Sequence, residues 1–133
     1  MDNSKLIELA KEARKFAFPQ LSGFKVGAAL LTKCGKVYKG CNVEDPSGIG
    51  VTNICAERCA IVKAVSEGYR DFTKIAVVGG MDELIFCLPC GACRQYINSF
   101  NAEMTVISFS PKDNEIKEFK LSELLPYSFD EKF

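Results

Sequence analysis

Three features are absent from this 133-residue sequence. It contains no histidine, so metal ligands and acid–base groups have to be sought among other side chains. It carries no net charge, because 17 lysines and arginines balance 17 aspartates and glutamates. No basic field is therefore available to gather nucleic acid or anionic lipid, and we expect no nucleic-acid partner. No apolar run approaches the ~20 residues that span a bilayer, so we expect no membrane partner either.

Internal repeats, linkers and low-complexity tracts are also missing, which predicts a single domain over residues 1–133. The first residues, MDNSKLIELAKEARK, are charged throughout and lack the apolar core of a signal peptide. The chain has seven cysteines, an odd number. Without a secretion signal, this favours reduced thiols in a reducing compartment, and we expect a cytoplasmic protein.

The pattern of apolar residues predicts alternating helices and strands. An opening helix is expected to stop before Pro19, and two strands follow around a two-residue turn at Cys34-Gly35. Helices are expected over 4–17, 55–67, 90–99 and 121–125, and strands over 25–32, 36–44, 74–79, 104–109 and 116–120. This order predicts an α/β fold, a three-layer α/β/α sandwich on a mixed sheet of about five strands.

The predicted order of helices and strands brings three cysteines to the same edge of the sheet. The helices that begin near Cys55 and Cys90 both start on the rim outside the carboxyl end of the strand over 74–79. Cys55, Cys90 and Cys93 can therefore converge, and helix N-termini lower the pKa of thiols placed there. Three sulfur ligands with a fourth position open describe a catalytic zinc site.

The cysteines also allow other interpretations. A closed structural site needs a fourth ligand, for which Cys87 is the only nearby candidate. A redox pair of Cys90 and Cys93 leaves Cys55 without a role. Small buried side chains are the default interpretation of the remaining cysteines, Cys34, Cys41, Cys59 and Cys87.

The stretch CAER gives the expected zinc site an acid–base group. Glu57 lies in the first turn of the same helix as Cys55, within reach of a zinc-bound water whose proton it could take and return. Three thiolates make the site negative, and Arg58 and Arg94 are the available cations. Taken alone, Glu57 could merely complement the helix dipole, and Arg58 could be a surface charge.

Asn42 and Glu44 stand two apart, so they share one face near the end of the second expected strand. The two-residue turn places Asn42 opposite Gly27, which suggests a slot for sugar hydroxyls. The same register places Glu44 opposite Lys25, so a cross-strand ion pair is the alternative.

The stretches CAER and PCGACRQ together resemble the cytidine deaminase family, specifically its small homotetrameric type with a three-cysteine zinc site. The resemblance extends over FKVGAALLT, GKVYKGCNVE, KAVSEG and ELLPYSF, nearly the whole chain. It implies that Cys55, Cys90 and Cys93 hold one Zn²⁺ per subunit and that Glu57 shuttles the proton. The implied reaction is hydrolytic deamination of cytidine or deoxycytidine, releasing ammonia, in pyrimidine salvage.

The resemblance also implies the remaining roles. Arg58 would pair with the zinc-bound thiolates, Asn42 and Glu44 would hold the ribose, and Phe24 would stack on the base. Backbone groups at Ala56 and before Pro89 would bind the base. A homotetramer is implied, in which Phe129 completes a neighbouring subunit's site, although packing within its own subunit explains that aromatic equally well.

Some residues depart from the family pattern. The loop over 45–54 is slightly longer and lacks an aromatic, Leu88 replaces a small hydroxyl residue, and Cys59 stands where threonine is common. The loop leaves the substrate range open, including the choice between cytidine and deoxycytidine. Alternative functions are an aminohydrolase for another cytosine compound such as blasticidin, a polynucleotide deaminase, and a non-catalytic zinc-stabilised module.

Overall fold

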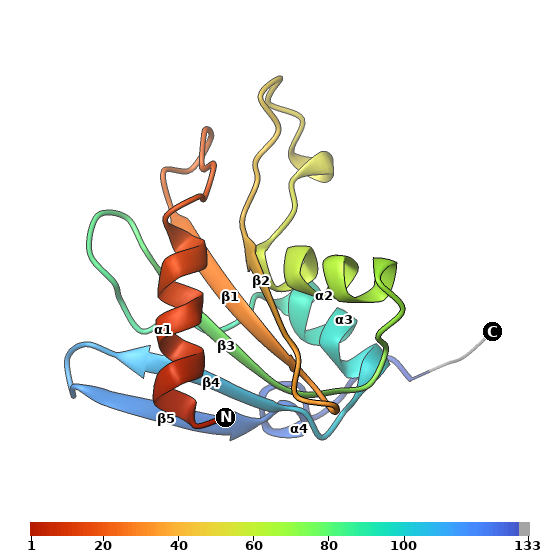
Figure 1. Ribbon diagram of the computed structural model, residues 1–133. Coiled ribbons are helices and arrows are strands. Elements are labelled where there is room, and N and C mark those ends of the chain that lie inside the picture. Colours follow the sequence, from red (N-terminus) through yellow and green to blue (C-terminus); the bar gives the residue numbers. More distant parts are fainter. Residues whose placement is uncertain (131–133) are drawn as a thin grey trace.

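The computed structural model describes residues 1–130, which form a mixed sheet covered by helices on both faces (Figure 1). The strands lie in the order β2-β1-β3-β4-β5; β3 and β4 are parallel, and every other neighbouring pair is antiparallel. Their bounds are β1 Lys25–Thr32, β2 Val37–Cys41, β3 Phe72–Gly80, β4 Thr105–Ser110 and β5 Glu115–Lys120. The predicted five-stranded mixed sheet is confirmed.

Four α-helices accompany the sheet: α1 Asn3–Arg14, α2 Ala56–Ser66, α3 Gly91–Phe100 and α4 Leu121–Leu124. A short 3-10 helix, Gly50–Thr52, interrupts the loop before α2. Helix α1 packs on one face of the sheet, whereas α2 and α3 pack on the other (Figure 1). The predicted three-layer arrangement is confirmed. None of the described helices is long and apolar enough to cross a membrane.

Helix α1 begins where the Asp2 side chain accepts a hydrogen bond from the Lys5 amide, and it buries one apolar face. It ends at Arg14, earlier than the expected Ala17. The chain leaves the helix because Phe18 pairs with Val43 in a parallel bridge, which requires extended backbone at Phe18.

The hairpin between β1 and β2 differs from the prediction. The Thr32 amide donates to the Lys36 carbonyl at 2.8 Å, so the loop contains three residues, and Gly35 supplies the positive φ of 94°. This shifts the register by one residue, and Gly27 faces Cys41 rather than Asn42. Strand β2 also ends at Cys41, before Asn42 and Glu44. The predicted position of Glu44 opposite Lys25 is therefore wrong.

Helix α2 is less enclosed than its apolar sequence suggests. Ala56, Ala60 and Ala64 are fully buried against the sheet, but Val62 is 43% exposed. Its N-terminus and that of α3 both lie at the carboxyl-terminal side of β3, as the predicted topology required. The residues just before these two helices, Cys55 and Cys90, are their N-caps.

Candidate active site

Three thiols meet where α2 and α3 begin. Cys55 and Cys90 are the N-cap residues, and Cys93 lies one turn further along α3. Their sulfur atoms all lie within 4.8 Å of one another, and those of Cys55 and Cys90 are 3.9 Å apart. Tetrahedral zinc with bonds of about 2.3 Å places neighbouring sulfurs about 3.8 Å apart. The three sulfur atoms therefore fit one zinc ion without a large rearrangement.

The charges around these thiols favour a thiolate. A hydrogen bond from Cys93 lowers the pKa of the Cys55 thiol to about 5, with Arg58 and Cys90 contributing despite partial burial. The pKa of Cys93 is raised, because it shares that hydrogen bond with Cys55 and is buried. Thiolate is the form that binds metal, and the lowered pKa keeps Cys55 in this form at neutral pH.

Arg58 is the cation of the cluster. One of its Nη atoms lies 3.6 Å from the Cys55 sulfur and 3.3 Å from the Asn53 carbonyl oxygen. Arg94, the other cation considered from the sequence, donates instead to the Pro89 and Leu124 carbonyls. Arg94 therefore ties backbone segments together, and Arg58 is left to offset the thiolate charge.

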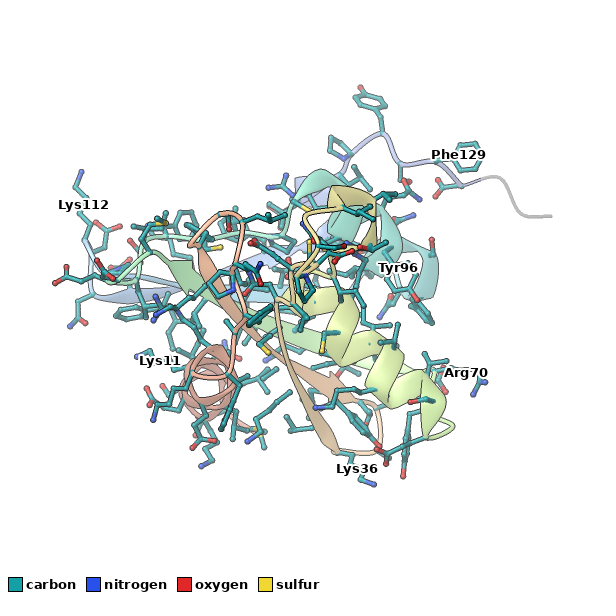
Figure 2. All side chains as sticks on the ribbon, turned by 90° about the horizontal axis from the view of Figure 1, so that it is seen from above. Lys11, Lys36, Arg70, Tyr96, Lys112 and Phe129 are labelled. Carbon is teal, nitrogen blue, oxygen red and sulfur yellow. The ribbon has the colours of Figure 1, made fainter. Side chains whose placement is uncertain are left out.

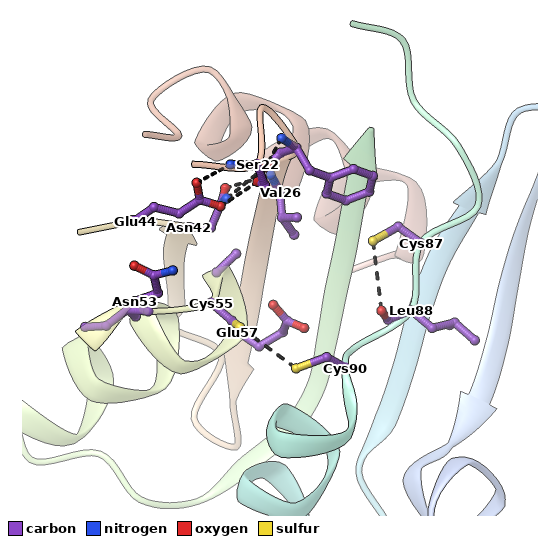
Figure 3. A pocket seen from close by; sticks show the side chains of 13 residues that line it. Ser22, Val26, Asn42, Glu44, Asn53, Cys55, Glu57, Cys87, Leu88 and Cys90 are labelled. Atoms are coloured by element: carbon purple, nitrogen blue, oxygen red, sulfur yellow. Dashed lines mark hydrogen bonds between the residues drawn. The ribbon is translucent and has the colours of Figure 1, made fainter. Parts of the chain in front are cut away.

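Glu57 lies in the first turn of α2, and its carboxylate faces the same pocket as Cys55 and Cys90 (Figure 3). It is only 3% exposed. Burial raises the pKa of Glu57 to about 7, a value that includes a smaller increase from the nearby Cys55 thiolate and some opposing hydrogen bonding. A carboxyl group with this pKa can take up and release a proton near neutral pH.

Asn42 and Glu44 lie together on another wall of this pocket (Figure 3). The Asn42 side chain accepts from the Val26 amide and donates to the Phe24 carbonyl, at 2.8 Å each. Glu44 is 8% exposed and takes part in none of the ion pairs among the described residues. The alternative pairing of Glu44 with Lys25 is therefore not formed.

The pocket encloses about 280 Å³, a volume near the lower end of small-ligand sites. Phe24 and Ala56 contribute to its wall, as do Cys87 and Leu88. A Cβ atom at Gly79 would lie 2.8 Å from the Cys87 sulfur and 3.0 Å from the Phe24 ring. Glycine at this position of β3 therefore lets both side chains approach the sheet.

Cys87 stands apart from the three-thiol cluster. The group of described residues that could share a metal contains Cys55, Cys90 and Cys93 but not Cys87. Burial raises the pKa of Cys87 to about 11, so its thiol is neutral. The described residues thus offer a metal three thiol ligands rather than four.

Some pocket residues were not identified from the sequence. Ser22 and Asn53 both line the pocket. The Asn53 side-chain oxygen accepts from the Asp45 amide at 2.6 Å, and its backbone holds Arg58. Neither residue belongs to a motif with its own chemistry, and only the folded chain brings them beside Glu44 and Cys55.

Phe129, by contrast, does not line the pocket of its own chain. It is 63% exposed and lies at the outer edge of the molecule (Figure 2). Its backbone is fixed to α3, because the Gln95 side chain accepts from the Phe129 amide and donates to its carbonyl. The aromatic ring is therefore presented outward from an anchored segment.

A buried carboxyl group beside three thiols at two helix N-termini defines a class of protein, the zinc-dependent hydrolases that keep one coordination position open. Comparison with known proteins is more specific. Residues 1–109 match the family model described as the cytidine and deoxycytidylate deaminase zinc-binding region. The chain belongs to this family.

Individual relatives agree with this assignment. The chain is 46% identical over 130 residues to a cytidine deaminase of Sporosarcina psychrophila, covering 97% of this chain and 92% of that protein. A crystal structure of cytidine deaminase from Burkholderia pseudomallei superposes with a TM-score of 0.85 at 40% identity, covering 97% of this chain and 100% of that chain. A blasticidin-S deaminase of Bacillus cereus is more distant, at 30% identity over 93% of this chain and 89% of that protein.

Proposed function

We propose that this chain hydrolyses cytidine, deoxycytidine or both to the corresponding uridine and ammonia. The observation that carries the proposal is the single pocket shared by two sets of groups. One set is the buried Glu57 beside the metal-binding thiols, which suits proton transfer. The other is Asn42 with Glu44, which suits binding of a sugar.

Zinc fits the donor set of the site. Cys55, Cys90 and Cys93 would hold one zinc ion per subunit, with Arg58 offsetting their charge through its contact with Cys55. Bound zinc supplies an acidified water, from which hydroxide is available near neutral pH.

Glu57 moves the protons of the reaction. Its carboxylate takes a proton from the attacking water and delivers it to N3 of the cytosine ring as the C4–O bond forms. It then takes the remaining proton of the attacking oxygen and transfers it to the exocyclic nitrogen. The C4–N bond breaks, ammonia leaves, and C4 becomes the carbonyl of uridine. A pKa of about 7 suits a group that has to act in both directions.

The walls of the pocket orient the nucleoside. Phe24 would stack on the base, and backbone groups at Ala56 and before Pro89 would bind its polar edge. Asn42 and Glu44 are assigned to the ribose. An ordinary nucleoside is favoured over a blasticidin-like compound, because the sugar-binding pair is intact and the blasticidin-S deaminase is the more distant relative. A non-catalytic zinc module needs neither Glu57 nor an open pocket.

A homotetramer is the proposed assembly, with Phe129 reaching a neighbouring subunit's site. Several large apolar side chains around α2 and the loops beside it are exposed: Phe16, Phe18, Ile49, Val51, Ile54 and Val62. Such a group of exposed apolar residues is typical of a protein–protein interface. Light scattering after size-exclusion chromatography tests the assembly. The single-domain organisation and a cytoplasmic role in pyrimidine salvage belong to the same proposal.

The decisive experiment is the ultraviolet absorbance change of purified, zinc-loaded protein mixed with cytidine, and in parallel with deoxycytidine. Conversion of either to its uridine product supports the proposal and identifies the accepted sugar. No conversion of either, with one zinc bound per chain and the fold intact, would refute it. Other cytosine compounds would then be the substrates to test, and the loop over 45–54 would be the segment expected to determine the substrate.

A further inference from the structure

Glu44 is held by an unusually complete set of hydrogen bonds from the loop between α1 and β1. The amides of Leu21 and Ser22 donate to its Oε1 atom at 2.6 and 2.8 Å. The Ser22 hydroxyl donates to Oε2 at 2.5 Å. The Ser22 hydroxyl bond, together with the two amides, lowers the pKa of Glu44 against its partial desolvation. Neutral donors alone therefore keep this carboxylate ionised and fixed (Figure 3).

The direction of the Ser22 hydroxyl is determined by a second bond. Its oxygen accepts from the Phe24 amide at 3.1 Å, so its single hydrogen points toward Glu44. Ser22 thus links the carboxylate to the backbone of Phe24, another residue of the pocket wall.

Counting acceptor positions shows what Glu44 can still bind. A carboxylate offers about four such positions, two on each oxygen. On Oε1 both are filled by amides, and on Oε2 the Ser22 hydroxyl fills one. One position on Oε2 remains, and it can only be filled by a hydrogen-bond donor.

Asn42 supplies the complementary group. Its side-chain nitrogen uses one hydrogen on the Phe24 carbonyl, which leaves one N–H, and it lines the same pocket wall as Glu44. A single remaining donor beside a single remaining acceptor matches one hydroxyl, which accepts from Asn42 and donates to Glu44.

We propose that Ser22 is a positioning residue, whose hydroxyl fixes the Glu44 carboxylate so that its last acceptor position meets one ring hydroxyl (2′ or 3′) of the substrate sugar. This inference rests on the proposed nucleoside function. Its physical basis is preorganisation, since a group already held in the bound geometry costs less conformational entropy when the ligand arrives. Ser22 itself touches no reacting atom.

The variant Ser22→Ala tests the role. It removes the hydroxyl and keeps both amide donors, so the pocket retains its outline while Glu44 gains freedom on the Oε2 side. We expect kcat/KM for cytidine to fall roughly tenfold, the loss typical of one hydrogen bond to a charged group, mostly through KM. Ser22→Thr keeps a hydroxyl and is expected to restore most of this loss.

A substrate without the 2′ and 3′ hydroxyls of the sugar separates positioning from general damage. For 2′,3′-dideoxycytidine, which keeps the 5′ hydroxyl but lacks both hydroxyls of the sugar ring, Ser22→Ala and wild type are expected to have the same kcat/KM within about twofold. Ser110→Ala is a matched control, because Ser110 donates a similar hydroxyl bond to the Asp113 carboxylate at 3.1 Å away from the pocket. This control is expected to leave both substrates unaffected.

The outcomes distinguish the two proposals. If zinc-loaded wild type deaminates neither cytidine nor deoxycytidine, the proposed function fails and the role of Ser22 fails with it. If wild type is active but Ser22→Ala matches it on cytidine, the positioning role alone is overturned. The same holds if Ser22→Ala loses activity equally on cytidine and on dideoxycytidine, because the hydroxyl then supports the pocket generally.

Discussion

Replacing Glu57 by glutamine is expected to remove proton transfer and to keep the fold and the metal site. Glutamine has the same shape, and the carboxylate it replaces is only 3% exposed in the first turn of α2. General acid–base catalysis contributes about 10²–10⁴-fold to a rate. Because Glu57 is assigned both proton transfers, we expect kcat for cytidine to fall by at least about 10³-fold, with one zinc still bound per chain.

Stability provides a second measurement on the same variant. Burial raises the pKa of Glu57 from its ordinary 4.5 to about 7 in the metal-free protein, which corresponds to about 3 kcal/mol. At a pH between 4.5 and about 7, Glu57 has lost its proton in the unfolded chain but keeps it in the folded chain. The free energy of unfolding of wild type therefore decreases as pH rises through this window. Glutamine does not ionise, so zinc-free Glu57→Gln is expected to exceed wild type by up to about 3 kcal/mol at pH 8 and to equal it near pH 4.5.

The assays are ultraviolet turnover of the zinc-loaded proteins, metal analysis, and urea unfolding of the zinc-free proteins at both pH values. A kcat above about one hundredth of wild type, with zinc bound, would refute the catalytic assignment. Equal stability of variant and wild type at pH 8 would refute the account of Glu57 as a carboxyl group whose charge is penalised by burial.

Three further predictions concern other parts of the site. Cys90→Ala is expected to lose zinc and activity together, whereas Cys87→Ala keeps one zinc per chain by metal analysis; loss of zinc from both would reinstate Cys87 as a ligand. Asn42→Ala is expected to raise KM for cytidine and also to lower the free energy of unfolding by about 1–3 kcal/mol, because the Val26 amide and Phe24 carbonyl lose their partner. Unchanged stability in urea unfolding would contradict that. If the proposed assembly is correct, Phe129→Ala lowers activity at least tenfold while the mass by light scattering stays that of wild type; full activity would leave the ring without a role in the neighbouring site.

The Asn42 prediction illustrates what the structure added. The sequence predicts Asn42 as part of a slot for sugar hydroxyls. In the folded chain it also bonds to two backbone groups of the neighbouring segment, so a substitution affects both. Such bonds depend on strand register, which a one-residue difference in the hairpin loop decides.

The sequence by itself determined the parts that depend on local spacing. The two helix starts at Cys55 and Cys90 follow from apolar periodicity, and the separation of Cys90 from Cys93 places both thiols within one helical turn. The position of Glu57 in the first turn after Cys55 follows in the same way. These relations hold within one element, and helix geometry fixes them without reference to the rest of the chain.

Only the tertiary structure decided the relations between segments distant in the sequence. It separated Cys87 from the three-thiol cluster, directed Arg94 to backbone carbonyls, and paired Glu44 with Ser22 instead of Lys25. The hairpin loop has three residues rather than two, and this moved every cross-strand neighbour between β1 and β2 by one position. The physical reason is that such contacts depend on turn conformation and on packing among several elements at once, neither of which residue spacing along the chain encodes.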